Sequence, residues 1–439
     1  MEQIDEIRVA MICHFSNADV RSHLPLDSRR LASALRKMMG LPAKGKVYGD
    51  IAAWDTQSIA ALSTRPDIEL HVISAHIGLK KAVVSYTDGP VHYNFVRCDE
   101  ATMLKYVFKS DSLWLRLNPM MPRVKKLVNG IKPDIVVLFG TENAYYSGTV
   151  LGIEGYPIYV LQQTVYNNPE RKKNNMWSTK NAYTEMQIFR KERYYGVYCR
   201  MHYDFVKQYQ PKAQVFKFGF PSKGKILDPT PTEKVYDFVN FALTLDLRKG
   251  AHDSIRAIAI IKRKYPQVKL NMVGGCNDVQ KADLDALVKE LGVENNVVFT
   301  SFFEKQSDLF LHIQKSRFAV LPCKMDSTSG TMSQAMQLGL PIVVYKTTGT
   351  PSFNREKLCA LIAEKENIEE LADQMIKLMD SPDLADELRR NARELQEKRV
   401  ADSLQNTDRL VANFYSIIDN YRNGTPIPSE QLFNPERDD

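Results

Sequence analysis

The residues best suited to chemistry follow short apolar runs that are typical of buried strands. Arg248 and Lys249 come after one such run and precede Gly250, at the expected start of a helix. Two cations beside the free backbone N–H groups of a helix N-terminus form a binding site for an anion such as a diphosphate. The alternative is an ordinary solvated basic helix start, and the pair alone does not separate the two.

A second group lies in residues 321–345, LPCKMDSTSGTMSQAMQLGLPIVVY. An apolar strand is followed by a polar turn and then by a helix, whose first N–H groups, near Gly330 and Thr331, favour phosphate. Asp326 and Gln334 are eight positions apart, so both can face a ligand held at the helix start. A carboxylate and an amide suit sugar hydroxyl groups, whereas the plainer alternative is a capped core helix.

Strands that alternate with helices would place these residues together at the ends of the strands. The sequence predicts two such alternating series along the chain. The stretch 221–234, PSKGKILDPTPTEK, is rich in proline and reads as the linker between the two series. We therefore predict an α/β protein with two Rossmann-like, doubly wound parallel-sheet domains that face a cleft. Ligands of such sheets bind outside the carboxyl ends of the strands. The predicted divisions are 1–222, 223–404, and 405–439, the last being a C-terminal helix that crosses back to the first domain, with its tail.

Composition narrows the class of protein. The chain has 439 residues, and 59 lysines and arginines against 52 acidic residues give a mild charge of +7, too dispersed to predict nucleic-acid binding. The longest purely apolar runs are about five residues, far from the roughly 20 that a membrane span needs. The acidic N-terminus predicts no secretory signal. The six cysteines form no C-x-x-C pair and the eight histidines form no H-x-x-x-H motif, so we expect reduced thiols, no metal site and a cytoplasmic protein.

Four segments of the second half carry a resemblance to a known family. In order, they are FALTLDLRKGAHDSIRA, KLNMVGG, NNVVFTSFF and the 321–345 segment. The series resembles the nucleotide-sugar-binding half of retaining glycosyltransferases with the GT-B fold, family 4 (glycosyl transferases group 1), over about Tyr236 to Tyr345. The first half resembles the family more loosely, at PDIVV in 133–137, at KFGFP in 217–221, and at the helix that Gly49 and Asp50 precede.

The resemblance implies a role for each matching residue. Lys249 matches the lysine that holds the donor diphosphate, whereas the family's arginine falls on Thr244, for which Arg248 can compensate. Asp326 and Gln334 fall where the family has two glutamates, one on the transferred sugar and one on the ribose. Lys249 and Asp326 are thus the implied catalytic residues. Further implied donor contacts are Gly49, Gly274, Thr300, Ser301, Ser329, Gly330 and Thr331.

The resemblance also implies a mechanism and its partners. Retaining members are thought to let the leaving diphosphate take the acceptor proton, so no dedicated base, metal or other cofactor is expected beside the UDP- or GDP-linked sugar. The acceptor, a glycan or a lipid-linked molecule, is expected on the first half, near Glu142, Gln162 or Gln163, and Trp177 of the basic loop. For each of these the alternative is an ordinary solvated loop.

A last candidate surface is the basic apolar stretch 101–128, which can rest on an anionic membrane at its cytoplasmic face. The alternative is an ordinary packed helix pair. The predicted function is therefore transfer of a sugar from a nucleoside-diphosphate sugar with retention of configuration. A non-catalytic homologue that binds nucleotide-sugar or regulates a partner is the alternative, because several family positions are substituted.

Overall fold

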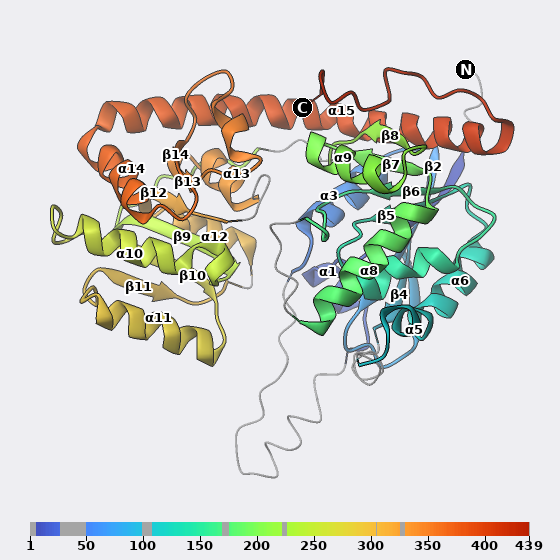
Figure 1. Ribbon diagram of the computed structural model, residues 1–439, viewed down its shortest axis with the longest axis horizontal. Helices are drawn as coiled ribbons and strands as arrows, with labels where there is room; N and C mark the ends of the chain where they lie inside the picture. Colours follow the sequence, from blue (N-terminus) through green and yellow to red (C-terminus); the bar gives the residue numbers. More distant parts are fainter. Residues whose placement is uncertain are drawn as a thin grey trace, which may run out of the picture. The chain divides into compact units, whose positions relative to one another are not determined.

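The computed structural model describes residues 6–26, 50–98, 108–168, 175–221, 226–303, 305–324 and 330–438. The chain divides into two compact units, which we call unit 1 (Met1–Gly224 with Asp402–Asp439) and unit 2 (Lys225–Ala401). Each unit is a mostly or wholly parallel sheet with helices on its faces (Figure 1). This confirms the predicted fold class of two Rossmann-like α/β domains.

The sheet of unit 1 has eight strands in the order β3-β4-β2-β1-β5-β6-β7-β8. All neighbouring strands are parallel except β3 and β4, which form an antiparallel hairpin. The central strands are continuous apolar runs because helices cover the sheet on both sides. The strands are β1 (Ile7–Cys13), β2 (Ile68–His76), β3 (Val83–Asp88), β4 (Val91–Arg97), β5 (Ile135–Phe139), β6 (Ile158–Leu161), β7 (Tyr194–Val197) and β8 (Gln214–Lys217).

Two buried layers hold the unit 1 helices against this sheet. On one face, α3 (Ala53–Leu62) and the C-terminal part of α15 (Pro382–Asn423) pack through residues such as Ile59, Leu62 and Phe414. On the other face, α6, α8 and α9 pack through residues such as Val124 and Ile188. The remaining unit 1 bounds are α1 (Ala18–Ser22), α5 (Asp111–Arg116), α6 (Met120–Ile131), α7 (Ala144–Ser147), η1 (Gly148–Gly152), α8 (Met176–Lys191) and α9 (Arg200–Tyr209).

The sheet of unit 2 has six strands, all parallel, in the order β11-β10-β9-β12-β13-β14. Helices α10, α11 and α14 pack on one face, and α12 and α13 pack on the other. The strands are β9 (Tyr236–Thr244), β10 (Leu270–Gly275), β11 (Val297–Thr300), β12 (Ser316–Leu321), β13 (Ile342–Tyr345) and β14 (Leu361–Ala363). The helices are η2 (Leu247–Lys249), α10 (Ala251–Ile261), α11 (Asp278–Glu290), α12 (Gln306–Ile313), α13 (Gly330–Gln337), η3 (Thr350–Asn354) and α14 (Ile368–Asp380).

The tail that follows α15 closes the edge of the unit 1 sheet. Leu432 bridges Phe216 of β8, the Lys217 N–H donates to the Gln431 carbonyl at 2.9 Å, and the Phe433 N–H donates to the Val215 carbonyl at 2.8 Å. An unpaired edge strand is a template for aggregation, and this backbone pairing covers it.

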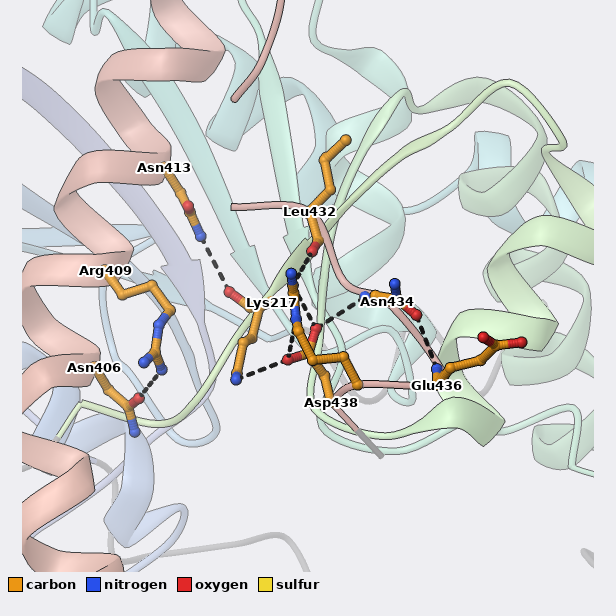
Figure 2. A network of polar contacts seen from close by, with 9 residues as sticks. Lys217, Asn406, Arg409, Asn413, Leu432, Asn434, Glu436 and Asp438 are labelled. Atoms are coloured by element: carbon orange, nitrogen blue, oxygen red, sulfur yellow. Dashed lines mark hydrogen bonds and ion pairs between the residues drawn. The ribbon is translucent and has the colours of Figure 1, made fainter. Parts of the chain in front are cut away.

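A polar network then fixes the end of the tail, as Figure 2 shows. The Asp438 carboxylate accepts from Lys217 Nζ at 2.9 Å, from Arg437 Nη2 at 2.8 Å and from the Asn434 N–H at 2.9 Å. Burial alone would raise the pKa of Asp438, but these donors hold that pKa well below its ordinary value. The carboxylate therefore stays ionised at neutral pH, and the tail is an integral part of unit 1.

Replacing Phe433 with alanine is expected to lower the free energy of unfolding by about 3 kcal/mol, because the ring is buried in the core beside β8. Urea unfolding followed by circular dichroism measures this loss. Glu436→Ala is the matched control, since Glu436 is exposed and its hydrogen bond to Asn434 uses the backbone N–H. A loss below about 1 kcal/mol for Phe433→Ala would contradict the docked tail.

Two strands were not expected from the sequence, and one expected helix break is absent. Strand β3 was not expected, although its turn to β4 consists of Gly89 and Pro90, two residues typical of turns. Strand β14 was also missed, because it has only three residues. The helical stretch 101–128 was expected to break at Pro119 and Pro122. The described part does break before Pro119, between α5 and α6, whereas Pro122 lies inside the first turn of α6. Among the residues that the structure describes, no helix has the length and apolar character that crossing a membrane requires.

Candidate active site

The basic loop after β9 is fixed by its own sequence. Asp246 caps the turn, since its Oδ1 accepts from the Lys249 N–H at 3.0 Å. Gly250 then takes a left-handed φ of 71°, and a Cβ there would lie 2.2 Å from the Pro322 carbonyl oxygen. Only glycine combines that backbone conformation with that approach. The loop is thereby locked against the end of β12, and α10 begins from it.

Arg248 and Lys249 project from this loop at the carboxyl ends of β9 and β12, which are neighbours in the sheet. Lys249 Nζ lies 3.7 Å from Cys323 Sγ, and the Arg248 carbonyl accepts from the Lys324 N–H at 2.9 Å. The Arg248 guanidinium bonds Asp246 Oδ2 at 2.8 Å and is 69% exposed. Two cations therefore stand at the edge where a ligand of a parallel sheet binds.

Thr244 and Gly274 lie at the same sheet edge. Thr244 is exposed at the end of β9 and pairs in register with Gly275 of β10. A Cβ on Gly274 would lie 2.2 Å from the Ala242 carbonyl oxygen of β9. The close packing of β9 on β10 is thus enough to require glycine at position 274, without a ligand.

Helix α13 starts at Gly330, which is exposed and has open space where a side chain would lie. Thr331 and Gln334 occupy its first turns and are half-buried. Helix α13 has eight residues and follows β12 in the chain, and a helix that follows a parallel strand begins at the carboxyl edge of the sheet, so its first N–H groups are expected at that edge. The predicted site residues Asp326, Ser329 and Gly49 lie outside the described residues.

The loop after β11 combines a polar triad with aromatic rings. Thr300 Oγ1 bonds Asn271 Oδ1 at 2.8 Å, and Asn271 Nδ2 lies 2.8 Å from His312 Nε2. Burial lowers the pKa of His312, so the ring is neutral at pH 7. Ser301 is exposed beside Phe302, whose side chain is 37% exposed. The sequence reasoning missed Phe302, a ring on which a nucleobase can stack.

Unit 1 carries a separate, partly buried polar cluster near the carboxyl ends of its strands and the start of α3, which we call the acceptor cluster: His14, Asp55, Glu142, Tyr146 and Gln163. Gln163 Nε2 bonds Asp55 Oδ1 at 3.1 Å, and Tyr146 Oη lies 3.5 Å from Glu142 Oε1. Asp55 is only 2% exposed although it is an acid. The structure thus brings Glu142 and Gln163 into one cluster, to which Asp55 and His14 are added.

Burial and like charge set the protonation of this cluster. Burial raises the pKa of Asp55 well above its ordinary value, and the neighbouring Glu142 raises it further. Burial likewise lowers the pKa of His14 to about 4, and His76 adds to this effect. The neutral His14 can donate and accept hydrogen bonds at neutral pH, and the raised pKa of Asp55 favours its protonated form, which can also do both. Such groups suit the recognition of hydroxyl groups.

The two glutamines after β6 have different roles. Gln162 is fully buried, and its Oε1 lies 3.3 Å from Thr141 Oγ1. Thr141 Oγ1 in turn donates to the buried Glu185 at 2.7 Å. Gln163 is the glutamine that reaches Asp55, while Tyr198 Oη donates to its backbone carbonyl at 2.9 Å.

Trp177 has different surroundings from the other predicted acceptor residues. It lies in the first turn of α8, which Asn175 caps, and its ring packs edge-on against Trp114 of α5 at a centroid distance of 6.0 Å. The ring is 37% exposed, beside the exposed Met176. Trp177 therefore belongs to the surface of the α5–α8 helix pair.

Replacing Asp55 with asparagine is expected to stabilise the protein increasingly as pH rises from 5 to 8. An acid whose folded pKa lies above its unfolded value loses stability over the range between the two values, and asparagine removes that loss. Thermal unfolding at several pH values measures the widening gap from the wild type. Asp204→Asn on the exposed face of α9 is the control. A gap that is constant with pH would contradict a protonated Asp55.

Comparisons with known proteins bear on both units. Residues 225–395 match the family model described as Glycosyl transferases group 1. A curated relative, an uncharacterized glycosyltransferase of Haemophilus influenzae, is 26% identical over 137 residues. That match covers 31% of this chain and 37% of the relative, so it spans little more than a third of the relative's length.

Solved structures share the fold over nearly the whole chain. Sucrose-phosphate synthase from Thermosynechococcus elongatus superposes with a TM-score of 0.65 at 13% identity, over 93% of this chain and 99% of that one. Anabaena HepE, solved with UDP and glucose, gives a TM-score of 0.60 at 14% identity, over 93% of this chain and 100% of the HepE chain. The chain thus has the GT-B fold, and the match to the Glycosyl transferases group 1 model lies within its second half.

Proposed function

We propose that this chain is a retaining glycosyltransferase of family 4, which moves a hexose from a UDP- or GDP-linked donor to a glycan or lipid-linked acceptor. The observation that carries the proposal is the locked basic loop, in which Arg248 and Lys249 stand at the carboxyl ends of β9 and β12 within the matching domain. A diphosphate is the ligand that best fits two cations beside a helix N-terminus.

Unit 2 supplies the donor site. Lys249 and Arg248 bind the diphosphate together with the backbone N–H groups at Gly330 and Thr331. Gln334 binds the ribose hydroxyl groups, since its amide offers both an acceptor and donors. Further donor contacts in unit 2 are proposed from the resemblance and the sheet edge: Thr244, Gly274, Thr300, Ser301, Asp326 and Ser329. From the resemblance alone, Gly49 of unit 1 is proposed as one more donor contact. Phe302 adds a ring for the base.

The proposed reaction takes place on one face of the donor sugar. The bond from the anomeric carbon to the diphosphate oxygen breaks, the acceptor oxygen bonds to that carbon on the same face, and the acceptor proton passes to the leaving diphosphate. Lys249 stabilises the negative charge that grows on the diphosphate. Electrostatic stabilisation of this kind is usually the largest contribution to catalysis. Asp326 positions the sugar. The reaction as proposed uses no metal ion.

Unit 1 supplies the acceptor site through the acceptor cluster. Glu142 and Gln163 contact the acceptor, and Asp55 positions Gln163 through the hydrogen bond of 3.1 Å. The solved HepE complexes with UDP and glucose support a nucleotide-sugar as the donor class, and they make UDP the first nucleotide to test here. The nucleotide-sugar and the acceptor are thus the proposed partners, with no nucleic acid.

Peripheral contact with the cytoplasmic face of a membrane is proposed for the α5–α8 surface. Phe108, Leu117, Met176 and Trp177 are exposed apolar side chains there, and Lys109 and Arg116 are exposed nearby in the sequence. Apolar side chains beside cations favour an anionic lipid surface. Vesicles with anionic lipid are expected to sediment the wild-type chain and to retain about tenfold less of Phe108→Ser with Trp177→Ser. Equal sedimentation of the wild type and the double variant would contradict membrane contact through this surface.

A turnover screen tests the proposed function. The full chain is incubated with UDP-, GDP- and ADP-linked sugars and mixed glycan acceptors, and released nucleotide is quantified. Release from one donor class, lost in Lys249→Ala and reduced in Gln334→Ala, is the expected result. Nucleotide binding without any turnover would favour the alternative, a non-catalytic homologue that binds nucleotide-sugar or regulates a partner.

A further inference from the structure

Three metal-binding side chains converge on the α6 face of the unit 1 sheet. Glu69 and His71 are on β2, two residues apart, so both side chains point to the same face. His92 on β4 is paired in register with His71. One ligand atom from each of the three side chains lies within 4.8 Å of the others.

Neighbouring groups already orient these ligands. His92 Nδ1 lies 3.0 Å from Thr87 Oγ1 on β3, and in the tautomer that donates this hydrogen bond the Nε2 lone pair is available to a metal. The other oxygen of Glu69, Oε2, accepts from Arg8 Nε at 2.7 Å. The rings of His71 and His92 stack with their centroids 4.6 Å apart. Hydrogen bonds of this kind to the outer atoms of ligands are typical of metal sites in proteins.

The set is separate from the acceptor cluster. His76, the residue of β2 that interacts electrostatically with His14 of that cluster, ends the strand five residues after His71, so the two histidines lie about 16 Å apart along β2. The side chains are half-buried, with 14% of His71 and 28% of Glu69 exposed, and an ion can therefore reach them from solvent. The site consequently has no part in the proposed sugar transfer.

We propose that Glu69, His71 and His92 bind a zinc ion that ties β4 to β2. Two imidazoles and one carboxylate are a donor set that zinc prefers, with water in the fourth position. His71 Nε2 and Glu69 Oε1 are now 2.7 Å apart in a hydrogen bond. They need to open only to about 3.3 Å to ligate one ion with bonds near 2.1 Å. No metal site was expected from the sequence, since its histidines and cysteines form no motif within one segment, whereas this set forms across two paired strands.

Zinc titration of the full chain, freed of any affinity tag and stripped with a chelator, tests the proposal. We expect one zinc ion per chain in equilibrium dialysis, and affinity lowered about 100-fold in His71→Gln and in His92→Gln. His23→Gln, which changes an exposed histidine elsewhere in unit 1, is the matched control and should leave affinity unchanged. Thr87→Val should weaken binding about tenfold, because it removes the partner of His92 Nδ1.

Two further readouts keep the test independent of folding defects. Cobalt(II) in place of zinc should give visible d–d absorption in the wild type and Thr87→Val but not in His92→Gln. Zinc should raise the melting temperature of the wild type more than that of His92→Gln, with metal-free melting compared first. Absence of stoichiometric binding at submillimolar zinc, or equal affinity in the wild type and both histidine variants, would overturn the proposal.

Discussion

Replacing Lys249 with alanine is expected to lower kcat/KM for the nucleotide-sugar about 100- to 1000-fold, the usual effect of removing one donor to a developing anion. The lysine is held at the carboxyl ends of β9 and β12 by the Asp246 cap and by Gly250. Lys249 lies on the loop before α10, and its ammonium group is 3.7 Å from the Cys323 thiol. Lys249 matches the lysine that holds the donor diphosphate in the resembled family, and it has that role in the proposed reaction.

Initial-rate kinetics with the donor found in the screen measure this effect. Arg248→Ala should cost about tenfold or less, because that guanidinium is mostly exposed and shared with Asp246. Lys262→Ala is the matched control, since Lys262 caps the other end of α10 and bonds the Gly292 carbonyl at 2.5 Å. An unchanged kcat/KM in Lys249→Ala would remove the diphosphate role from this loop.

Replacing Gly250 with alanine is expected to cost about 3 kcal/mol of folding free energy and at least tenfold in donor affinity. The residue has a φ of 71°, which costs an alanine about 1 kcal/mol, and its new Cβ would lie 2.2 Å from the Pro322 carbonyl oxygen. Backbone atoms on both sides must move to relieve that contact. The loop that carries Arg248 and Lys249 moves with them.

The chain offers a matched control for this variant. Gly292 has a similar φ of 61°, but a Cβ there would meet nothing within 4 Å. Gly292→Ala should therefore cost only the conformational strain, about 1 kcal/mol, and leave donor affinity unchanged. Urea unfolding and nucleotide titration of both variants separate strain from crowding. Equal losses in the two variants would show that the contact with Pro322 does not hold the loop.

Periodicity and linker composition were sufficient to predict the two α/β units. Continuous apolar runs such as Ile135–Phe139 indicate parallel strands buried on both faces, and they lie at the centre of the observed sheet. Strand β3 escaped prediction because it pairs as an edge hairpin, where half-exposed residues give no apolar run. Strand β3 is held by its hydrogen bonds to β4, and the hydrophobic pattern of its own residues does not reveal that pairing.

The candidate site could be predicted only in part from the sequence, because some of its residues are brought together only by the packing of distant segments. Arg248, Lys249 and Gly250 are adjacent in the chain, so their shared loop could be predicted. Asp55 could not, because an acid in an amphipathic helix ordinarily faces solvent, and only the packing of α3 buries it beside Gln163. Gly274 shows the opposite case, in which a glycine taken for a ligand contact is explained by the approach of β9.

Calorimetric titration of the full-length chain with UDP and with GDP tests the central claim most directly. The account predicts that one of the two nucleotides binds with a one-to-one stoichiometry, and that Lys249→Ala weakens its binding at least tenfold while Lys262→Ala does not. Absence of binding by either nucleotide at millimolar concentration, or equal affinity in the wild type and Lys249→Ala, would contradict it.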